Sequence, residues 1–239
     1  MNKIIIANWK MNQVSQEIFD NIQQFEKIDY PVEFLLAPSV PYLFHFANKS
    51  LDNIRICAQD VSSIEGFGAY TGEYSAKILK ECGVNYAIIG HSERRNILME
   101  SNDLIKQKFQ ACVNAKITPI VCVGEDLESR KNNNFKEKIV EQIIGSTISC
   151  TEDYIIAYEP LWAIGSGITP TVEEIAEILY FLRTDKKISQ LAKNARLVYG
   201  GSVSSGNSRS ILSIDNNDGI MIGSASVDKN ELKKILNNT

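Results

Sequence analysis

The chain has 239 residues, of which 44% are hydrophobic and 23% charged, a balance typical of a soluble globular protein with a sizeable core. Its 25 Lys and Arg residues against 29 Asp and Glu residues give a net charge of −4, which argues against nucleic acid as a partner. Apolar runs are only a few residues long, so we expect no membrane span, no signal peptide and a cytoplasmic location. The five cysteines include no C-x-x-C pair and there are only two histidines, so we expect reduced thiols and no metal site.

Eight short runs rich in Ile and Val recur along the chain. They are nearly continuous hydrophobic stretches, which is the composition of parallel strands covered on both faces. The predicted strands are residues 3–10, 32–37, 54–58, 86–90, 118–123, 154–158, 196–199 and 219–222.

Helical patterns lie between these strands, with apolar residues at three- and four-residue spacings. The clearest are 103–115, 135–144 and 172–182, and the last begins at a predicted capping box of Thr171 and Glu174. Alternating strands and helices allow either an open doubly wound sheet or a closed barrel. Eight such units, with no linker-like segment between them, favour a barrel formed by one α/β domain over residues 1–239.

The carboxyl ends of the strands are the first place to look for function, because barrel enzymes carry their reactive groups there. The first strand leads to Asn8 and Lys10, which alternation places on the same side. A lysine in the barrel mouth needs an anionic partner, and the alternative is a surface lysine. The fourth strand leads to His91, at the start of a helix whose partial positive charge disfavours a second proton on imidazole. The alternatives are a core histidine for His91 and a plain ion-pair cluster for Glu93 and the arginines that follow.

The sixth strand ends in Glu159, followed by a proline-stiffened, mostly apolar loop, residues 160–170. Folded over a ligand, this loop would exclude water and raise the basicity of the carboxylate; the alternative is a loop that packs on its neighbours. Strands seven and eight are followed by Gly200, Gly201 and Gly223. Glycines there let backbone amides approach a phosphate, although ordinary turns also use them.

Four segments together resemble the triosephosphate isomerase family, in the family's order and spacing: residues 8–12 (NWKMN), 90–95 (GHSERR), 157–165 (AYEPLWAIG) and 199–203 (YGGSV). The resemblance implies a single (β/α)8 TIM barrel acting on a small phosphorylated triose. It would interconvert dihydroxyacetone phosphate and glyceraldehyde 3-phosphate through an enediol, in glycolysis and gluconeogenesis, with no metal or organic cofactor. Another phosphate-binding biosynthetic barrel, or a non-catalytic binding barrel, would not need Lys10, His91 and Glu159 together.

The resemblance also implies roles for individual residues. Glu159 is the expected base, His91 the group that polarises the carbonyl, and Glu93 a supporting residue. Lys10 and Asn8 are expected to stabilise the oxyanion. Lys10 is expected to add positive charge near the phosphate. The phosphate itself is expected to be held by the backbone amides of Gly165, Ser202, Gly223 and Ser224.

Family members are typically homodimers in which the loop after the third strand enters the neighbouring subunit. Here that loop runs from Gln59 to Glu73. Thr71 matches the residue that braces the partner subunit's Asn8 and the partner subunit's His91. We therefore expect a homodimer assembled through this loop.

Four residues depart from the family pattern. Asp60 stands where asparagine is usual and adds a charge that needs a partner near the interface. Ile168 replaces a lysine often found in the far hinge of the loop over the site. Pro170 replaces an alanine whose N–H donates to the tyrosine matching Tyr199 when that loop closes, so this latch should be missing. Ser224 replaces a glycine, and its amide keeps its place if its φ suits a non-glycine residue.

Overall fold

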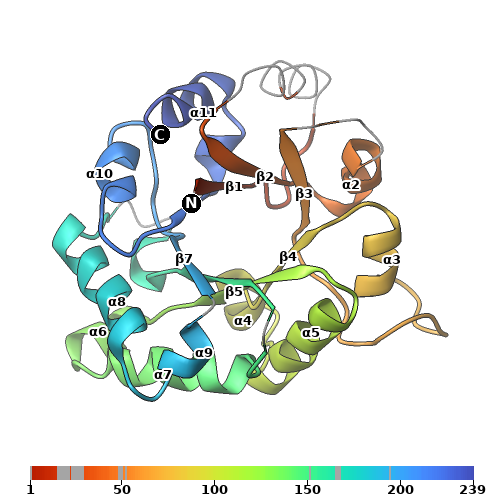
Figure 1. Ribbon diagram of the computed structural model, residues 1–239, viewed down its shortest axis with the longest axis horizontal. Coiled ribbons are helices and arrows are strands. Elements are labelled where there is room, and N and C mark those ends of the chain that lie inside the picture. The colour runs from red at the N-terminus through yellow and green to blue at the C-terminus, as the bar shows by residue number, and fades with distance from the viewer. Residues whose placement is uncertain are drawn as a thin grey trace.

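The computed structural model describes residues 2–14, 22, 30–47, 51, 53–150, 152–164, 168–193 and 195–239. Eight parallel strands pair in chain order, and β1 pairs with both β2 and β8, so the sheet closes into a barrel. Helices surround this barrel on the outside (Figure 1). The prediction of a closed barrel over an open sheet is therefore confirmed. The strands are β1 (Lys3–Asn8), β2 (Val32–Ala37), β3 (Ile54–Ala58), β4 (Tyr86–Ile89), β5 (Thr118–Val123), β6 (Tyr154–Tyr158), β7 (Ala195–Tyr199) and β8 (Gly219–Ile222).

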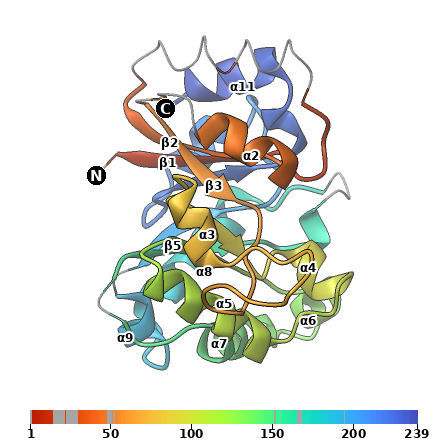
Figure 2. The ribbon, with the colours of Figure 1, turned by 90° about the vertical axis from the view of Figure 1, so that its right-hand side faces the viewer.

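The helices follow the strands around the barrel, and the side view places α4 and α6 at the end opposite to the start of β1 (Figure 2). In the described ranges, no helix has the length and apolar character needed to cross a bilayer. The helices are α2 (Val40–Ala47), α3 (Ala76–Glu81), α4 (Ser92–Asn96), α5 (Asn102–Asn114), α6 (Leu127–Lys131), α7 (Phe135–Ser146), α8 (Val172–Thr184), α9 (Ser189–Ala192), α10 (Ser208–Leu212) and α11 (Lys229–Leu236), with short 3-10 turns η1 (Leu161–Ala163) and η2 (Ser224–Ser226).

Element boundaries agree with the sequence patterns to within two residues, and the differences at two strand ends have local causes. The first strand ends at Asn8, because Lys10 has a left-handed backbone with φ of 48°. The fourth ends at Ile89, before Gly90 with φ of 63°. The predicted capping box at the start of α8 is confirmed, because the Glu174 N–H donates to Thr171 Oγ1 and the Thr171 N–H donates to Glu174 Oε2.

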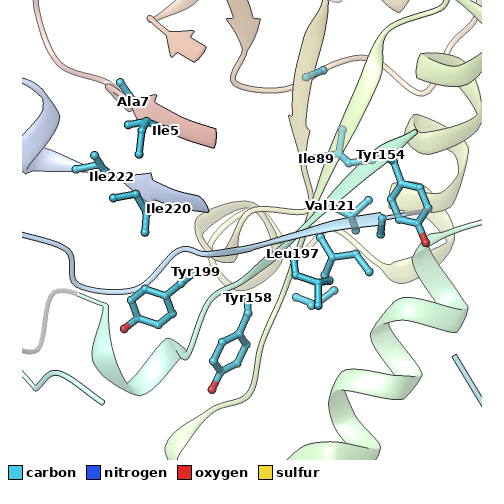
Figure 3. Packing of buried hydrophobic residues seen from close by; sticks show 14 of the residues in the cluster. Ile5, Ala7, Ile89, Val121, Tyr154, Tyr158, Leu197, Tyr199, Ile220 and Ile222 are labelled. Atoms are coloured by element: carbon cyan, nitrogen blue, oxygen red, sulfur yellow. The ribbon is translucent and has the colours of Figure 1, made fainter. Parts of the chain in front are cut away.

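The core has two layers, which follow from side-chain alternation along each strand. One layer fills the space between the strands and the helices, and Figure 3 shows part of it, including Ile5, Val121 and Leu197. The other fills the barrel and contains Ile4 and Ile6 from β1 and Ile155 and Ala157 from β6, among others. Continuing the inward series by two residues reaches Asn8 on β1 and Glu159 after β6. Alternation therefore carries these two polar residues to the barrel mouth.

Candidate active site

A cavity of about 570 Å3 opens at the carboxyl ends of the strands. Most of the residues predicted to form a site line it together, although they come from five separate strand ends. They are Asn8, Lys10, His91, Glu93, Glu159, Ser202, Gly223 and Ser224. Gly165 lies outside the described residues. Thr71 is exposed in the loop after β3 and does not line the cavity.

Lys10 is held in its left-handed backbone conformation by its neighbours. Its amide donates to Asn8 Oδ1 at 3.0 Å, and its carbonyl accepts from Ser39 Oγ at 2.7 Å and Gln59 Nε2 at 2.8 Å. Such a conformation costs a non-glycine residue on the order of 1–3 kcal/mol, so it persists only where the surroundings impose it. The ammonium Nζ lies 2.6 Å from Glu93 Oε1. Lys10 thus lines the cavity and has an anionic partner, as the barrel-mouth alternative requires.

His91 is the N-cap of α4, which confirms the helix start predicted after the fourth strand, and its side chain is almost fully buried. Its Nδ1 accepts the backbone N–H of Glu93 at 3.2 Å. The Glu93 carboxylate is farther from this nitrogen, at 3.5 Å, so the amide determines the tautomer. An Nδ1 that accepts an amide carries no proton, and the ring proton therefore belongs on Nε2, toward Glu159.

Glu159 closes a continuous line of polar groups. Its side chain is only 2% exposed, Oε2 accepts the Ser92 N–H at 3.0 Å, and Oε1 lies 3.1 Å from His91 Nε2. The line runs from Lys10 through Glu93 and His91 to this carboxylate. An ammonium, an imidazole with its proton on the facing nitrogen and a carboxylate can together move a proton and stabilise a developing negative charge.

The loops after β7 and β8 line the opposite wall of the cavity. Gly201 is required by close packing, because a Cβ there would lie 2.2 Å from the Tyr199 hydroxyl oxygen. Ser202 Oγ donates to the carbonyl of Ala163 at 2.7 Å and so ties this loop to η1. Ser224 is outside the set of residues with positive φ, so a non-glycine residue fits there without strain.

Several residues that hold the site were not singled out from the sequence. Gln59 donates to the carbonyls of both Lys10 and Ala37, at 2.8 and 2.9 Å. Ser92 supplies an amide to Glu159, and Asn207 Nδ2 donates to the carbonyl of Ser202. Of these residues, Gln59 could have been found from its place in the sequence, because it follows directly after β3 and so lies at the same end of the barrel as Lys10.

The loop after β6 is anchored at its start by a buried carboxylate. Glu125 accepts from Trp162 Nε1 at 2.9 Å and from the Tyr158 hydroxyl at 3.1 Å. Burial raises the pKa of Glu125, with these donors acting in the opposite direction. Farther along the loop, Ile168 is exposed, and nothing in the structure explains its replacement of a lysine.

The partner that the charge of Asp60 requires lies within the same chain. Lys108 Nζ lies 2.8 Å from both Asp60 oxygens and 2.6 Å from Glu100 Oε1, and Arg94 contacts both carboxylates. Burial raises the pKa of Asp60 against these cations. Burial acts the same way on Glu100, but the hydrogen bonds from Arg94 and Lys108 outweigh it and lower that pKa. This four-residue ion cluster joins the loop after β3 to α4 and α5.

We expect Asp60→Asn to lower the free energy of unfolding by about 2 kcal/mol. Removing one partner of a buried pair costs about 3–5 kcal/mol, and Lys108 keeps Glu100 in this variant. Urea unfolding measures the change, with Asp215→Asn on the exposed surface as the control. The double variant Asp60→Asn/Lys108→Met should recover part of the loss, because it restores the charge balance. A single variant as stable as the control would show that the cluster contributes no net stability.

Comparisons with known proteins agree over the length of the chain. The family model described as Triosephosphate isomerase matches residues 3–239. The chain is 40% identical to the triosephosphate isomerase of Thermodesulfovibrio yellowstonii, over 98% of both chains. It is 38% identical to that of Orientia tsutsugamushi (strain Ikeda), over 99% of this chain and 97% of the relative. The crystal structure of triosephosphate isomerase from Bartonella henselae superposes with a TM-score of 0.86 at 31% identity, covering 100% of this chain and 99% of the other.

Proposed function

The chain belongs to the triosephosphate isomerase family and interconverts dihydroxyacetone phosphate and glyceraldehyde 3-phosphate, and we propose that Glu159, His91 and Lys10 carry out this reaction. Glu159 takes a proton from the carbon next to the carbonyl, and the electron pair of that C–H bond moves toward the carbonyl oxygen. The first carbonyl oxygen gains a proton to give the enediol; the neighbouring hydroxyl then loses its proton as the new carbonyl forms, and the carbon proton returns to the former carbonyl carbon, which completes the isomerisation. No redox partner is needed, because the same atoms are present in substrate and product.

The other two residues stabilise the charge that forms on oxygen. His91 Nε2 carries the proton that is donated to the substrate oxygen, and the helix amide on Nδ1 fixes this tautomer. Lys10 Nζ supplies a positive charge from the other side, with Asn8 beside it. Glu93 contacts Lys10 and orients it. When substrate binds, it lies between His91 Nε2 and Glu159 Oε1 and takes the place of the contact between them.

The phosphate group is held by backbone amides after the last two strands. Ser202, Gly223 and Ser224 line the same cavity as Lys10, which adds charge. Gly165, outside the described residues, would contribute from the loop over the site. That loop also keeps water from the enediol, and so limits loss of phosphate.

The observation that carries this proposal is the unbroken line from Lys10 to Glu159 in one cavity. The test is an assay of the purified protein with glyceraldehyde 3-phosphate, coupled to a dehydrogenase that consumes dihydroxyacetone phosphate. We expect rapid oxidation of the dehydrogenase's cofactor. Folded protein without turnover would favour one of the two rivals, a different phosphate-binding barrel enzyme or a binding protein.

The proposal extends to a homodimer. Large apolar side chains are exposed after β1 and after α4, including Met11 at 96% and Met99 at 78% exposure, as well as singly on other helices, such as Tyr180 on α8. Phe67 and Tyr70 are exposed in the loop from Gln59 to Glu73, and Ile97 and Leu98 after α4. Exposed apolar groups concentrated in this way mark a protein–protein interface. In the dimer, Thr71 would reach the partner's site.

We expect Thr71→Arg to weaken this dimer by at least about tenfold, equal to about 1.4 kcal/mol, because a long cation would replace a small hydroxyl in the interface. Sedimentation measures the dissociation constant, and turnover per chain should fall on dilution. Ser210→Arg adds the same charge at an exposed position of α10. Equal behaviour of the two variants would remove Thr71 from the interface.

We expect Tyr199→Phe to change kcat by less than about twofold, because among the described residues the hydroxyl makes no hydrogen bond that phenylalanine would lose. Burial raises the pKa of Tyr199, with the Ser202 backbone acting the other way, yet no group in the described residues reaches hydrogen-bond geometry with the hydroxyl. Pro170 has no N–H to offer. Steady-state kinetics checks this, with Ser202→Ala as the comparison, since Ser202 does bond to Ala163. A large loss of kcat in Tyr199→Phe would show that a donor other than the residue 170 amide binds this hydroxyl when the loop closes.

The proposed location is the cytoplasm. All five cysteines are free, and Cys57, Cys112 and Cys122 are buried. Thiols that stay reduced suit a reducing compartment.

A further inference from the structure

The loop after β7, residues 200–207, is bonded to the last helix of the chain through one residue, Ser205. The Ser205 N–H donates to Glu231 Oε1 at 2.6 Å, and its Oγ donates to Glu231 Oε2 at 3.1 Å. The Ser205 carbonyl accepts from Asn238 Nδ2 at 2.9 Å, and the same nitrogen donates to Ser208 Oγ at the start of α10. The amide, the hydroxyl and the carbonyl of Ser205 are therefore all bonded to α11 or to the residues that follow it.

Glu231 is the third residue of α11, but its side chain does not serve the end of the helix. The N-cap is Asp228, whose Oδ1 accepts the amides of Asn230 and Glu231 at 2.8 and 2.9 Å. At the same position of α8, the Glu174 carboxylate turns back to the N–H of its own N-cap, Thr171, and completes a capping box. Glu231 instead directs both carboxylate oxygens to a loop residue 26 positions earlier in the chain.

The same helix is continuous with the loop after β8. The turn η2 ends at Ser226, and α11 begins after Asp228. Ser226 is fixed on two sides, because its Oγ donates to the carbonyl of Gly223 at 2.6 Å and its carbonyl accepts Trp9 Nε1 at 3.2 Å. The two loops that the proposed function assigns to phosphate therefore meet at α11: one leads into the helix, and the other is bonded to Glu231.

The contact at Ser205 is close to the site along the chain. Ser204 and Asn207, on either side of it, line the active-site cavity together with Ser202. Asn207 Oδ1 accepts the Ser204 N–H at 2.8 Å, and its Nδ2 donates to the Ser202 carbonyl at 3.1 Å. The segment from Ser202 to Asn207 is thus held together by its own hydrogen bonds, so a shift at Ser205 is passed on to Ser202.

We propose that Glu231 is a positioning residue for phosphate binding: through Ser205 it fixes the loop after β7 relative to the loop after β8, so that the amides of both converge on one anion. The inference rests on the proposed function, which places phosphate between these loops. Glu231 is outside the described lining of the active-site cavity, so it acts through Ser205 and not by touching substrate. Amides that are fixed before binding pay less ordering entropy when the anion arrives.

The test measures KM for glyceraldehyde 3-phosphate and the inhibition constant of inorganic phosphate, used as a competitive inhibitor. Glu231→Ala loses both bonds to Ser205, and we expect both constants to rise by at least about fivefold while kcat changes by less than about twofold. Glutamine still accepts the Ser205 N–H and donates to its Oγ, so in Glu231→Gln the rise should be no more than about twofold. Glu137→Ala removes the same charge from the third residue of α7, at an exposed position, and should change neither constant.

The pattern of results separates positioning from charge and from stability. If the charge of Glu231 repelled phosphate directly, both Glu231 variants would bind phosphate more tightly, and the proposal would be overturned. An inhibition constant that is unchanged in Glu231→Ala would also overturn it, even if the free energy of unfolding fell. If Glu231→Ala does not fold, Asn238→Ala decides, because it frees the Ser205 carbonyl from beyond the end of α11 and should raise the inhibition constant in the same way. Phosphate that does not compete with substrate in the unaltered protein would instead refute the proposed phosphate site itself.

Discussion

Replacing Glu159 by Gln is expected to lower kcat by about 10⁴-fold, the upper range of what a general base contributes. Glutamine has nearly the same size and keeps an oxygen that can accept the Ser92 N–H, but it cannot take a proton from carbon. KM should change little, because the loops after β7 and β8, which are proposed to hold phosphate, are untouched. Steady-state kinetics in both directions measures the two constants.

Glu159→Asp refines the same prediction. The carboxylate keeps its basicity but retreats by one methylene, and a displacement of about 1 Å can cost on the order of 10²-fold in rate. The ranking Glu, then Asp, then Gln is what a positioned base requires. Glu128→Gln, at an exposed position of α6, removes the same charge as a control and should leave kcat unchanged. Turnover in Glu159→Gln equal to this control would exclude Glu159 as the base.

The positions of Asn8 and Glu159 follow from the sequence because local rules suffice. Parallel strands in a closed barrel place all their carboxyl ends together, and a period of two along β1 and β6 carries Ile4–Ile6 to Asn8 and Ile155–Ala157 to Glu159. His91 at a helix start is equally local, since only the next two residues are needed to form its cap.

Features that depend on distant pairs could not be predicted in the same way. Lys10 leaves the strand because Ser39 and Gln59 hold its carbonyl, and no pattern in residues 3–10 encodes those partners. Asp60 finds Lys108, which is 48 residues away. Alternation correctly indicates which side a residue faces, but which groups meet there depends on how neighbouring loops pack.

The close approach of the chain after β5 to Glu159 is a further consequence of packing between elements. Gly124 has no room for a side chain, because a Cβ would lie 1.8 Å from the Glu159 carbonyl oxygen. The backbone after β5 therefore runs directly against Glu159, the proposed base. The glycines expected to serve the ligand follow β7 and β8, whereas Gly124, after β5, is required by the close approach of two chain segments. The sequence alone does not distinguish these reasons.

Lys10→Met is expected to lower kcat by about 10²–10³-fold, the loss typical of removing one group that stabilises a transition-state oxyanion. Methionine keeps the length and the apolar stem, so the change is mainly one of charge. KM should rise as well, because Lys10 also faces the phosphate loops, and Glu93 loses the cation 2.6 Å from its Oε1. A rise in KM alone would assign Lys10 to binding and not to the reaction step.

The matched control lies at the start of β1, the strand that Lys10 follows. Lys3→Met removes an identical charge at the opposite end of β1, where Lys3 Nζ donates to the carbonyl of Asn217. Both variants shift the net charge equally, so any effect on the approach of an anionic substrate through overall charge is common to them. Only Lys10→Met removes a cation from the cavity. If the two variants lost the same small fraction of kcat, the lysine after β1 would act through the field of the whole protein, and the assignment of an oxyanion-stabilising role to Lys10 would fail.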